Sequence, residues 1–178
     1  VAGHEMSHGV TSRTAKLVYS GESGGLNEST SDIFGTAVEF YAGNSADPGD
    51  YLIGEKIMIG GKGYLRNMMD PTLDGGSIDH YSKYKNGIDV HYSSGIANNF
   101  FYLLSEGGKN RTSGKTVTGI SRAKAEKIWY RALTVYMTSS TNFKAARTAT
   151  LSAAKDLYGA TGAEYAAVGN AWTAVGVN

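Results

Sequence analysis

Two histidines four residues apart open the 178-residue chain, in His4-Glu5-Met6-Ser7-His8. On a helix, residues i and i+4 share one face, so both imidazoles can reach a single metal ion. Glu5 is rotated by about a quarter turn from His4 and can hold a water molecule on that ion. The chain has no cysteine, so any metal must be held by histidine and carboxylate side chains. A helix that carries solvated His and Glu side chains is the alternative interpretation.

A second polar cluster follows in "GGLNESTSD", residues 24–32. Glu28 and Asp32 are again four residues apart, so on a helix both carboxylates face the same way. One of them can bind zinc, while the other accepts a hydrogen bond from the free ring N–H of a ligand histidine and fixes its tautomer. Asn27 is a further candidate for that second role. Two carboxylates and an amide on an otherwise apolar helix favour a zinc site.

The helices that must position these groups follow from apolar residues spaced three and four apart. This spacing predicts helices over 1–14, 26–42, 94–106, 121–137, 142–158 and 162–174. We expect "ESGG" at 22–25 to form a turn. Ser121 and Asn142 are the expected N-caps, and Gly159 is expected to end a helix. Five large residues are expected to pack in the core of the resulting helical bundle: Trp129, Tyr130, Leu133, Tyr136 and Leu157.

The segment from 44 to 93 has no such periodicity, and its Gly, Asp, Asn and Ser residues predict a long irregular region. With 178 residues the whole chain, 1–178, fits one domain that can bury a core. A net charge of +1 gives no electrostatic case for a nucleic-acid partner. No apolar run approaches the ~20 residues of a membrane span, so we expect no membrane partner.

Several motifs, in order, resemble the thermolysin family of zinc neutral metalloproteases, in its bacterial secreted branch. They are HExxH with a glutamate 24 residues after His4, "LVYSGESGGLNE", "SDIFGT", "YLRNMMDP", "DHYSKY", "DVHYSSGI", "FFYLLSEGG" and "AVGV". The resemblance covers essentially the whole chain. It implies the mainly α, helical-bundle C-terminal domain of that fold, with a long irregular loop region that binds calcium and carries active-site residues. It also implies one catalytic zinc on His4, His8 and Glu28, a ligand set taken from the family.

The resemblance also implies a mechanism with named residues. Glu5 would act as general base toward a zinc-bound water, and Tyr19 and His91 would stabilise the oxyanion. Asp89, or alternatively Asn86, would orient His91. The function that the resemblance implies is the hydrolysis of peptide bonds by an endopeptidase that is secreted to the extracellular space.

Substrate recognition would rest on Arg66, which corresponds to an arginine that contacts the substrate backbone. Four apolar residues match positions that line the pocket for the residue after the cut: Val1, Ile53, Ile57 and Leu65. Their apolar character predicts a preference for Leu, Phe or Ile at that substrate position. His80 also lies in a family motif, and a structural hydrogen-bonding role is expected for it.

Hard oxygen ligands gather around "NSADPGDYLIGE" at 44–55, which suits calcium. Glu39, Asp50 and Glu55 match family calcium ligands, the Leu52 carbonyl is a possible addition, and Asp47 is the less favoured alternative. Leu52 stands where the family has an acidic bridging residue, so we expect one calcium ion rather than two. The loop "IMIGGKG" lacks the carboxylate of another family site, which we expect to be absent.

Three functions compete. The leading one is the secreted endopeptidase, whose N-terminal strand-rich domain would lie outside this chain and form the other wall of the cleft. We expect the helix that carries His4 and His8, which starts near Val1, to have been cut from that N-terminal half of the enzyme. The second is a non-catalytic C-terminal fragment that keeps the metal site, either an autolysis product or a domain bound to a protein inhibitor, propeptide or partner. The third, a zinc aminopeptidase, lacks its exopeptidase motif here.

Overall fold

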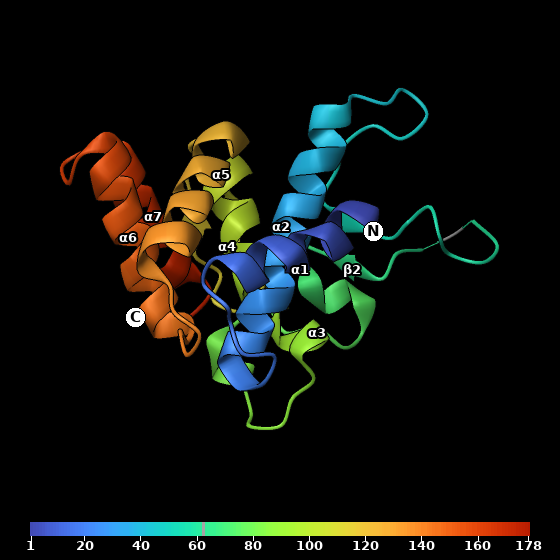
Figure 1. Ribbon diagram of the computed structural model, residues 1–178, viewed down its shortest axis with the longest axis horizontal. Helices are drawn as coiled ribbons and strands as arrows, with labels where there is room; N and C mark the ends of the chain where they lie inside the picture. The colour runs from blue at the N-terminus through green and yellow to red at the C-terminus, as the bar shows by residue number, and fades with distance from the viewer. Residues whose placement is uncertain (62) are drawn as a thin grey trace.

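Helix α2 (Gly21–Ala42) is the longest element and runs through the middle of the molecule in the computed structural model, which describes residues 1–61 and 63–178 (Figure 1). Helix α1 (Ala2–Arg13) lies across it. The remaining helices are α3 (Val90–Ser93), α4 (Gly95–Glu106), α5 (Arg122–Arg131), α6 (Phe143–Tyr158) and α7 (Ala163–Ala174). Ala132–Tyr136 (η3) extends α5 as a π-helix. The predicted fold class, mainly α, is confirmed.

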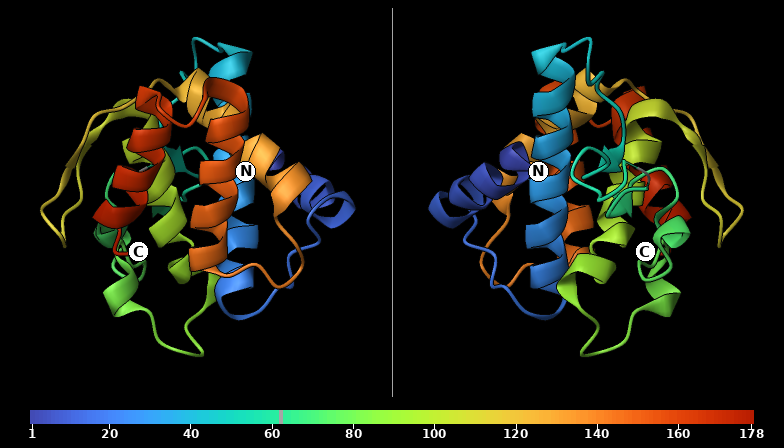
Figure 2. Two further views of the ribbon diagram at one scale, coloured as in Figure 1. Left: turned by 90° about the vertical axis from the view of Figure 1, so that its left-hand side faces the viewer. Right: turned by 90° about the vertical axis from the view of Figure 1, so that its right-hand side faces the viewer.

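The region between α2 and α3 is irregular, as the sequence predicts. Its first part, directly after α2, projects as loops on the side of α2 away from α6 and α7 (Figure 1), whereas Tyr81 near its end packs against Phe143 of α6. It holds two 3₁₀ turns, η1 (Pro71–Asp74) and η2 (Tyr81–Lys83). It also holds β1 (Leu52–Ile53) and β2 (Arg66–Asn67), which pair antiparallel with Leu52 opposite Asn67. A second hairpin, β3 (Gly108–Lys109) with β4 (Thr116–Val117), extends on the face of the molecule opposite α1 (Figure 2). No helix in the described part of the chain is long and apolar enough to cross a membrane.

The core lies between α2 and the α4–α7 helices, where Phe100 stacks on Trp172 with ring centroids 4.0 Å apart. Trp129 and Leu133 are buried there as predicted. The core prediction is wrong for Tyr130, Tyr136 and Leu157, which are 56%, 37% and 41% exposed. Each helical residue is turned about 100° from the one before. Tyr130 therefore leaves the face that buries Trp129 and turns toward Phe34 of α2.

The predicted turn at 22–25 is wrong, because α2 already begins at Gly21. Its glycines serve close packing instead of a turn. A Cβ added to Gly24 would lie 2.5 Å from Cγ1 of Val90, and one added to Gly25 would lie 2.6 Å from Oγ of Ser93. The absence of side chains at these two positions therefore lets α3 dock on the first turns of α2.

We expect Gly24→Ala to destabilise the protein by about 1–3 kcal/mol, because the added methyl overlaps Val90 in a packed contact. Gly169→Ala is the matched control in α7, where an added Cβ meets nothing closer than 3.9 Å. That change should stabilise the protein by about 0.5–1 kcal/mol, since alanine restricts the unfolded chain. Urea unfolding measures both. Equal effects of the two substitutions would contradict the packing role of Gly24.

Two of the three residues predicted to cap or end a helix do so in the structure. Asn142 accepts a hydrogen bond from the backbone N–H of Ala145 at 2.8 Å, and α6 ends before Gly159, both as predicted. Ser121 stands at the N-cap of α5 but makes no capping hydrogen bond. Its φ of 82° departs from the extended conformation in which a cap side chain reaches the helix N–H groups.

Candidate metal centre

The side chains of His4, His8 and Glu28 meet where α1 crosses α2. One ligand atom from each lies within 4.8 Å of the others. Nε2 of His4 is 3.4 Å from one oxygen of Glu28, and Nε2 of His8 is 3.3 Å from the other. The crossing is close because Gly35 lacks a side chain: a Cβ there would stand 3.0 Å from the backbone nitrogen of His4.

The chemistry of these donors fits zinc, which binds imidazole nitrogen and carboxylate oxygen. Glu28 is 1% exposed, and its Oε2 makes no hydrogen bond with any residue that the structure describes. A buried carboxylate oxygen that faces two imidazole nitrogens without a hydrogen bond is suited to a cation.

The other ring nitrogen of each histidine is held by α2. Nδ1 of His4 donates to Oδ1 of Asp32 at 2.7 Å, and Nδ1 of His8 donates to Oδ1 of Asn27 at 2.8 Å. Asn27 is itself fixed, because its Nδ2 donates to the carbonyl of Leu17 at 2.9 Å. Both imidazoles therefore present Nε2 toward Glu28, which is the tautomer that a metal site requires.

Asp32 is fully buried, and its oxygens also accept two hydrogen bonds from Arg66, each 2.8 Å long. Burial alone would raise the pKa of Asp32, but Arg66 and His4 hold it well below its usual range. Burial would likewise lower the pKa of His4, yet its hydrogen bonds to Asp32 and Glu28 raise it to about 9. Metal uptake at neutral pH must therefore displace a proton from His4.

Tyr19 and His91 reach the centre from outside α1 and α2. The hydroxyl of Tyr19 donates to Oε1 of Glu28 and lies 3.3 Å from Nε2 of His91. Oδ1 of Asp89 accepts from the backbone N–H of His91 at 2.8 Å and from its Nδ1 at 2.7 Å. Of the two alternatives for holding His91, the structure brings Asp89, and not Asn86, into contact with it.

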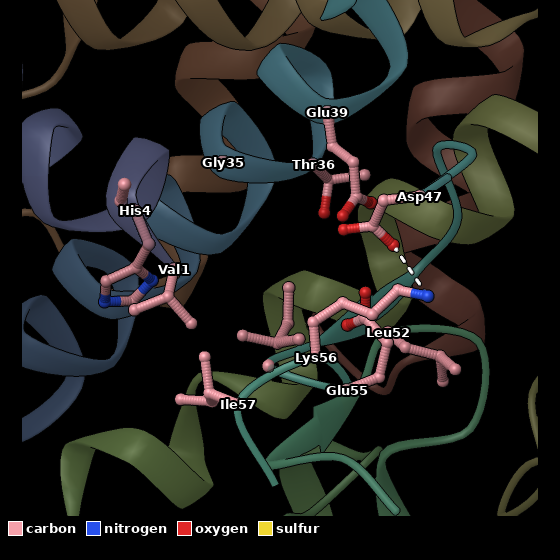
Figure 3. Close-up of a pocket in the computed structure, with 13 residues that line it drawn as sticks. Val1, His4, Gly35, Thr36, Glu39, Asp47, Leu52, Glu55, Lys56 and Ile57 are labelled. Carbon is pink, nitrogen blue, oxygen red and sulfur yellow. Dashed lines mark ion pairs between the residues drawn. The ribbon is translucent and has the colours of Figure 1, made fainter. Parts of the chain in front are cut away.

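A pocket of about 200 Å³ opens beside His4. Its lining includes Val1, Ile53 and Leu65 together with Glu5, Arg66 and His91. Of the four apolar residues predicted to line one pocket, Ile57 is the exception. It is 58% exposed and lines the neighbouring cavity shown in Figure 3.

The neighbouring cavity ends in an acidic cluster. Carboxylate oxygens of Glu39, Asp47 and Glu55 lie within 4.8 Å of one another, beside Leu52 (Figure 3). Burial, with the neighbouring carboxylates, raises the pKa of Glu39. A cation bound here would relieve the repulsion among these carboxylates.

Asp47, the less favoured ligand in the sequence, is the aspartate grouped with Glu39 and Glu55. Asp50 lies beside this group, where its backbone N–H donates to Oε2 of Glu39 at 3.2 Å and its Oδ1 accepts from the backbone N–H of Leu52 at 2.7 Å. Nζ of Lys56, which the sequence reasoning did not single out, lies 3.3 Å from Oδ1 of Asp47 (Figure 3).

Two further predictions concern residues away from the zinc ligands. His80 caps η2, where its side chain accepts from the backbone N–H of Ser82. It lies outside the group of His4, His8 and Glu28. The predicted absence of another calcium site at 57–63 includes Lys62, which lies outside the described residues.

Asn98 is the contact that sequence reasoning missed at the centre itself. Its Nδ2 donates to Oδ2 of Asp32 at 2.8 Å. The available signal was the pair Asn98-Asn99 in the otherwise apolar "GIANNFFYLL", because buried amides need partners.

Fold and site together define a helical domain that carries the HExxH motif of zinc metallopeptidases. Residues 15–177 match the family model described as thermolysin metallopeptidase, alpha-helical domain, and the chain therefore belongs to the thermolysin metallopeptidase family.

Among similar proteins, the chain is 56% identical to a transglutaminase-activating metalloprotease of Streptomyces mobaraensis, covering 99% of this chain and 25% of that protein. It is 50% identical to a bacillolysin of Bacillus cereus, covering 100% of this chain and 31% of that protein. A solved precursor of protealysin from Serratia proteamaculans aligns with a TM-score of 0.75 at 31% identity, over 99% of this chain and 56% of that one. The chain thus spans about a quarter to a third of these curated relatives.

Proposed function

We propose that this chain is the helical, metal-binding domain of a secreted zinc endopeptidase. The observation that carries the proposal is convergence: the donors of His4, His8 and Glu28 stand together, and Tyr19 and His91 both contact Glu28. The match to the thermolysin metallopeptidase family, and a relative named as a transglutaminase-activating metalloprotease, support the same class of reaction.

Zinc held by His4, His8 and Glu28 would supply a Lewis acid that polarises the substrate carbonyl and lowers the pKa of a bound water toward ~7. Glu5 lines the pocket beside His4, where its carboxylate takes the proton of the attacking water and returns it to the leaving amine. His91 Nε2 and the Tyr19 hydroxyl, 3.3 Å apart, donate hydrogen bonds to the oxyanion. Asp89 holds the His91 ring for this task.

The pocket of about 200 Å³ is the proposed site for the substrate residue that follows the cut. Val1, Ile53 and Leu65 make part of its wall apolar, so burial of a Leu, Phe or Ile side chain is favoured. Ile57 lies at the edge of the neighbouring cavity and extends this apolar surface. Arg66, anchored on Asp32, presents its guanidinium to the substrate backbone.

An apolar groove of about 730 Å³ runs along α1 and α2 and is lined by Met6, Val38, Tyr41 and Tyr130, among others. Met6 and Tyr41 are 78% and 93% exposed. Large exposed apolar surfaces of this kind mark contacts with another domain or protein. We assign this groove as the surface that the strand-rich N-terminal domain of the longer enzyme covers. A propeptide or protein inhibitor would bind at the pocket beside His4.

The open groove also favours the second candidate, a non-catalytic helical domain that binds metal. One experiment separates the two: zinc content and cleavage of a peptide library are measured for the full-length protein and for the 178-residue chain alone. The proposal expects one zinc per molecule and cuts before Leu, Phe or Ile in the full-length protein. Zinc binding without cleavage in either sample would favour the second candidate, and no zinc in either would refute the proposed centre.

We also propose one structural calcium ion at Glu39, Asp47 and Glu55, in the cavity that Leu52 also lines. Calcium at about 100 times its Kd should stabilise the protein by about 2.7 kcal/mol, and a chelator should remove this gain. Asp47→Asn should abolish the calcium-dependent rise in Tm. Asp50→Asn, the matched control, should keep it, because the Asp50 side chain serves its own turn. A rise lost only in Asp50→Asn would contradict the assignment of Asp47.

A further inference from the structure

Asp32 is the point at which three separate elements meet behind the zinc ligands. Oδ1 accepts from Nδ1 of His4 and from Nη2 of Arg66, and Oδ2 accepts from Nε of Arg66 and from Nδ2 of Asn98. The donors come from α1, β2 and α4. A carboxylate has about four lone-pair positions, so these four donors occupy all of them.

Within this arrangement Asn98 has a distinct task. The two hydrogen bonds of Arg66 align the Asp32 carboxylate with the guanidinium plane, and the contact from Asn98 adds a constraint from a different element. The amide of Asn98 approaches the oxygen that does not contact His4, at 2.8 Å, and so fixes the carboxylate from the other side. The direction of the His4 imidazole depends in turn on Asp32.

The hydrogen bonds of the Asn98 amide also support this task, because its Nδ2 has a partner and its Oδ1 has none among the described residues. Asn98 is 1% exposed, yet its Oδ1 has no hydrogen-bond partner within residues 1–61 and 63–178. Its neighbour Asn99, also 1% exposed, uses both ends: Nδ2 donates to the carbonyl of Met69 at 2.8 Å, and Oδ1 accepts from Asn110 at 3.0 Å. Asn99 is thus a fully satisfied structural amide, whereas Asn98 is bonded only where it meets Asp32.

We infer that Asn98 is a positioning residue of the metal centre, which holds Asp32 so that His4 and Arg66 keep their orientations together. The inference rests on the proposed zinc function. It extends the centre by one residue, to α4, and makes the affinity for zinc depend on an amide that contacts no metal ligand directly.

The test compares Asn98→Leu with Asn99→Leu in the full-length protein, because both remove a buried amide from the same helix at equal exposure. Zinc Kd is measured by competition with a chelator, and kcat and KM by peptide cleavage. Asn98→Leu should weaken zinc binding about tenfold, the low end of the range for residues behind a ligand, and should raise KM through Arg66. Asn99→Leu should lower Tm and leave zinc Kd within about twofold of the unsubstituted protein.

Asn98→Ala, which adds no apolar bulk, is measured alongside in case Asn98→Leu does not fold. A double-mutant cycle with Asp32→Asn completes the test, since a residue that acts through Asp32 loses its effect once that carboxylate is gone. Zinc Kd of the double variant should equal that of Asp32→Asn. Additive losses, or equal losses in the Asn98 and Asn99 variants, would overturn the inference. Failure of the unsubstituted protein to bind zinc would instead refute the proposed function.

Discussion

Glu5→Gln is expected to abolish peptide hydrolysis while the protein keeps its zinc. The Glu5 side chain is not among the grouped ligands, which are His4, His8 and Glu28, but it lines the pocket beside His4. Glutamine has the same shape and cannot accept the proton of the attacking water. Loss of a general base lowers turnover by about 10²–10⁴-fold.

Two measurements decide the result: zinc per molecule by elemental analysis, and kcat/KM on a peptide with Leu after the cut. Glu164→Gln is the matched control, because Glu164 lies in the distant α7 and pairs there with Lys124 of α5. This variant should retain full activity. Unchanged turnover in Glu5→Gln would show that another group takes the proton. Loss of zinc together with turnover would instead place Glu5 among the ligands.

Asp32→Asn is expected to give the largest loss of stability. The change removes the negative charge from a fully buried side chain and leaves Arg66, whose side chain is only 11% exposed, without its main partner. The next carboxylate oxygen, from Glu28, is 3.8 Å from the guanidinium. Breaking a buried ion pair on one side costs about 3–5 kcal/mol. Zinc affinity should fall by about 10–100-fold as well, because the Asp32–His4 bond is lost.

Urea unfolding of metal-free protein measures the first effect and chelator competition the second. Asp70→Asn is the control, because Asp70 forms its ion pair with Arg111 at the surface. That pair should contribute less than about 1 kcal/mol. If Asp32→Asn were no more destabilising than Asp70→Asn, the network around Asp32 would not be a source of stability.

The same carboxylate sets a pH dependence for the metal-free protein. Its pKa in the folded state lies well below the ordinary value of 3.8, so the unfolded state binds the proton more readily. The stability that Asp32 contributes is therefore fully present above about pH 4 and is lost as pH falls further. Unfolding of Asp32→Asn should depend less on pH in this acid range.

The sequence alone predicted the helical class of the fold and placed His4 with His8, and Glu28 with Asp32, on shared helix faces, whereas the set of zinc ligands was taken from the resemblance to the family. These shared faces rest on local geometry, since His4 and His8 face the same way because a helix turns once in 3.6 residues. Glu28 and Asp32 do so for the same reason. The apolar spacing that marks α4, α6 and α7 is equally local. Such features survive any arrangement of the helices in space.

Tertiary structure decided which residues meet across the chain. Asp32 contacts His4, Arg66 and Asn98, which are 28, 34 and 66 residues away, and no periodicity in the sequence connects them. The group of Glu39, Asp47 and Glu55 likewise joins α2 to the loop that follows it.

The start of α2 and the exposure of Tyr130 were likewise set by packing. The glycines of "ESGG" resemble a turn in sequence, but in the fold they are the places where α3 comes too close for a Cβ. Tyr130 has the apolar spacing of a core residue, yet it lines the groove beside α1 and α2. Local sequence specifies which face of an element is apolar or polar. The neighbour that covers that face is specified only by the packing of segments distant in the sequence. Where two such segments approach most closely, only small residues such as glycine fit.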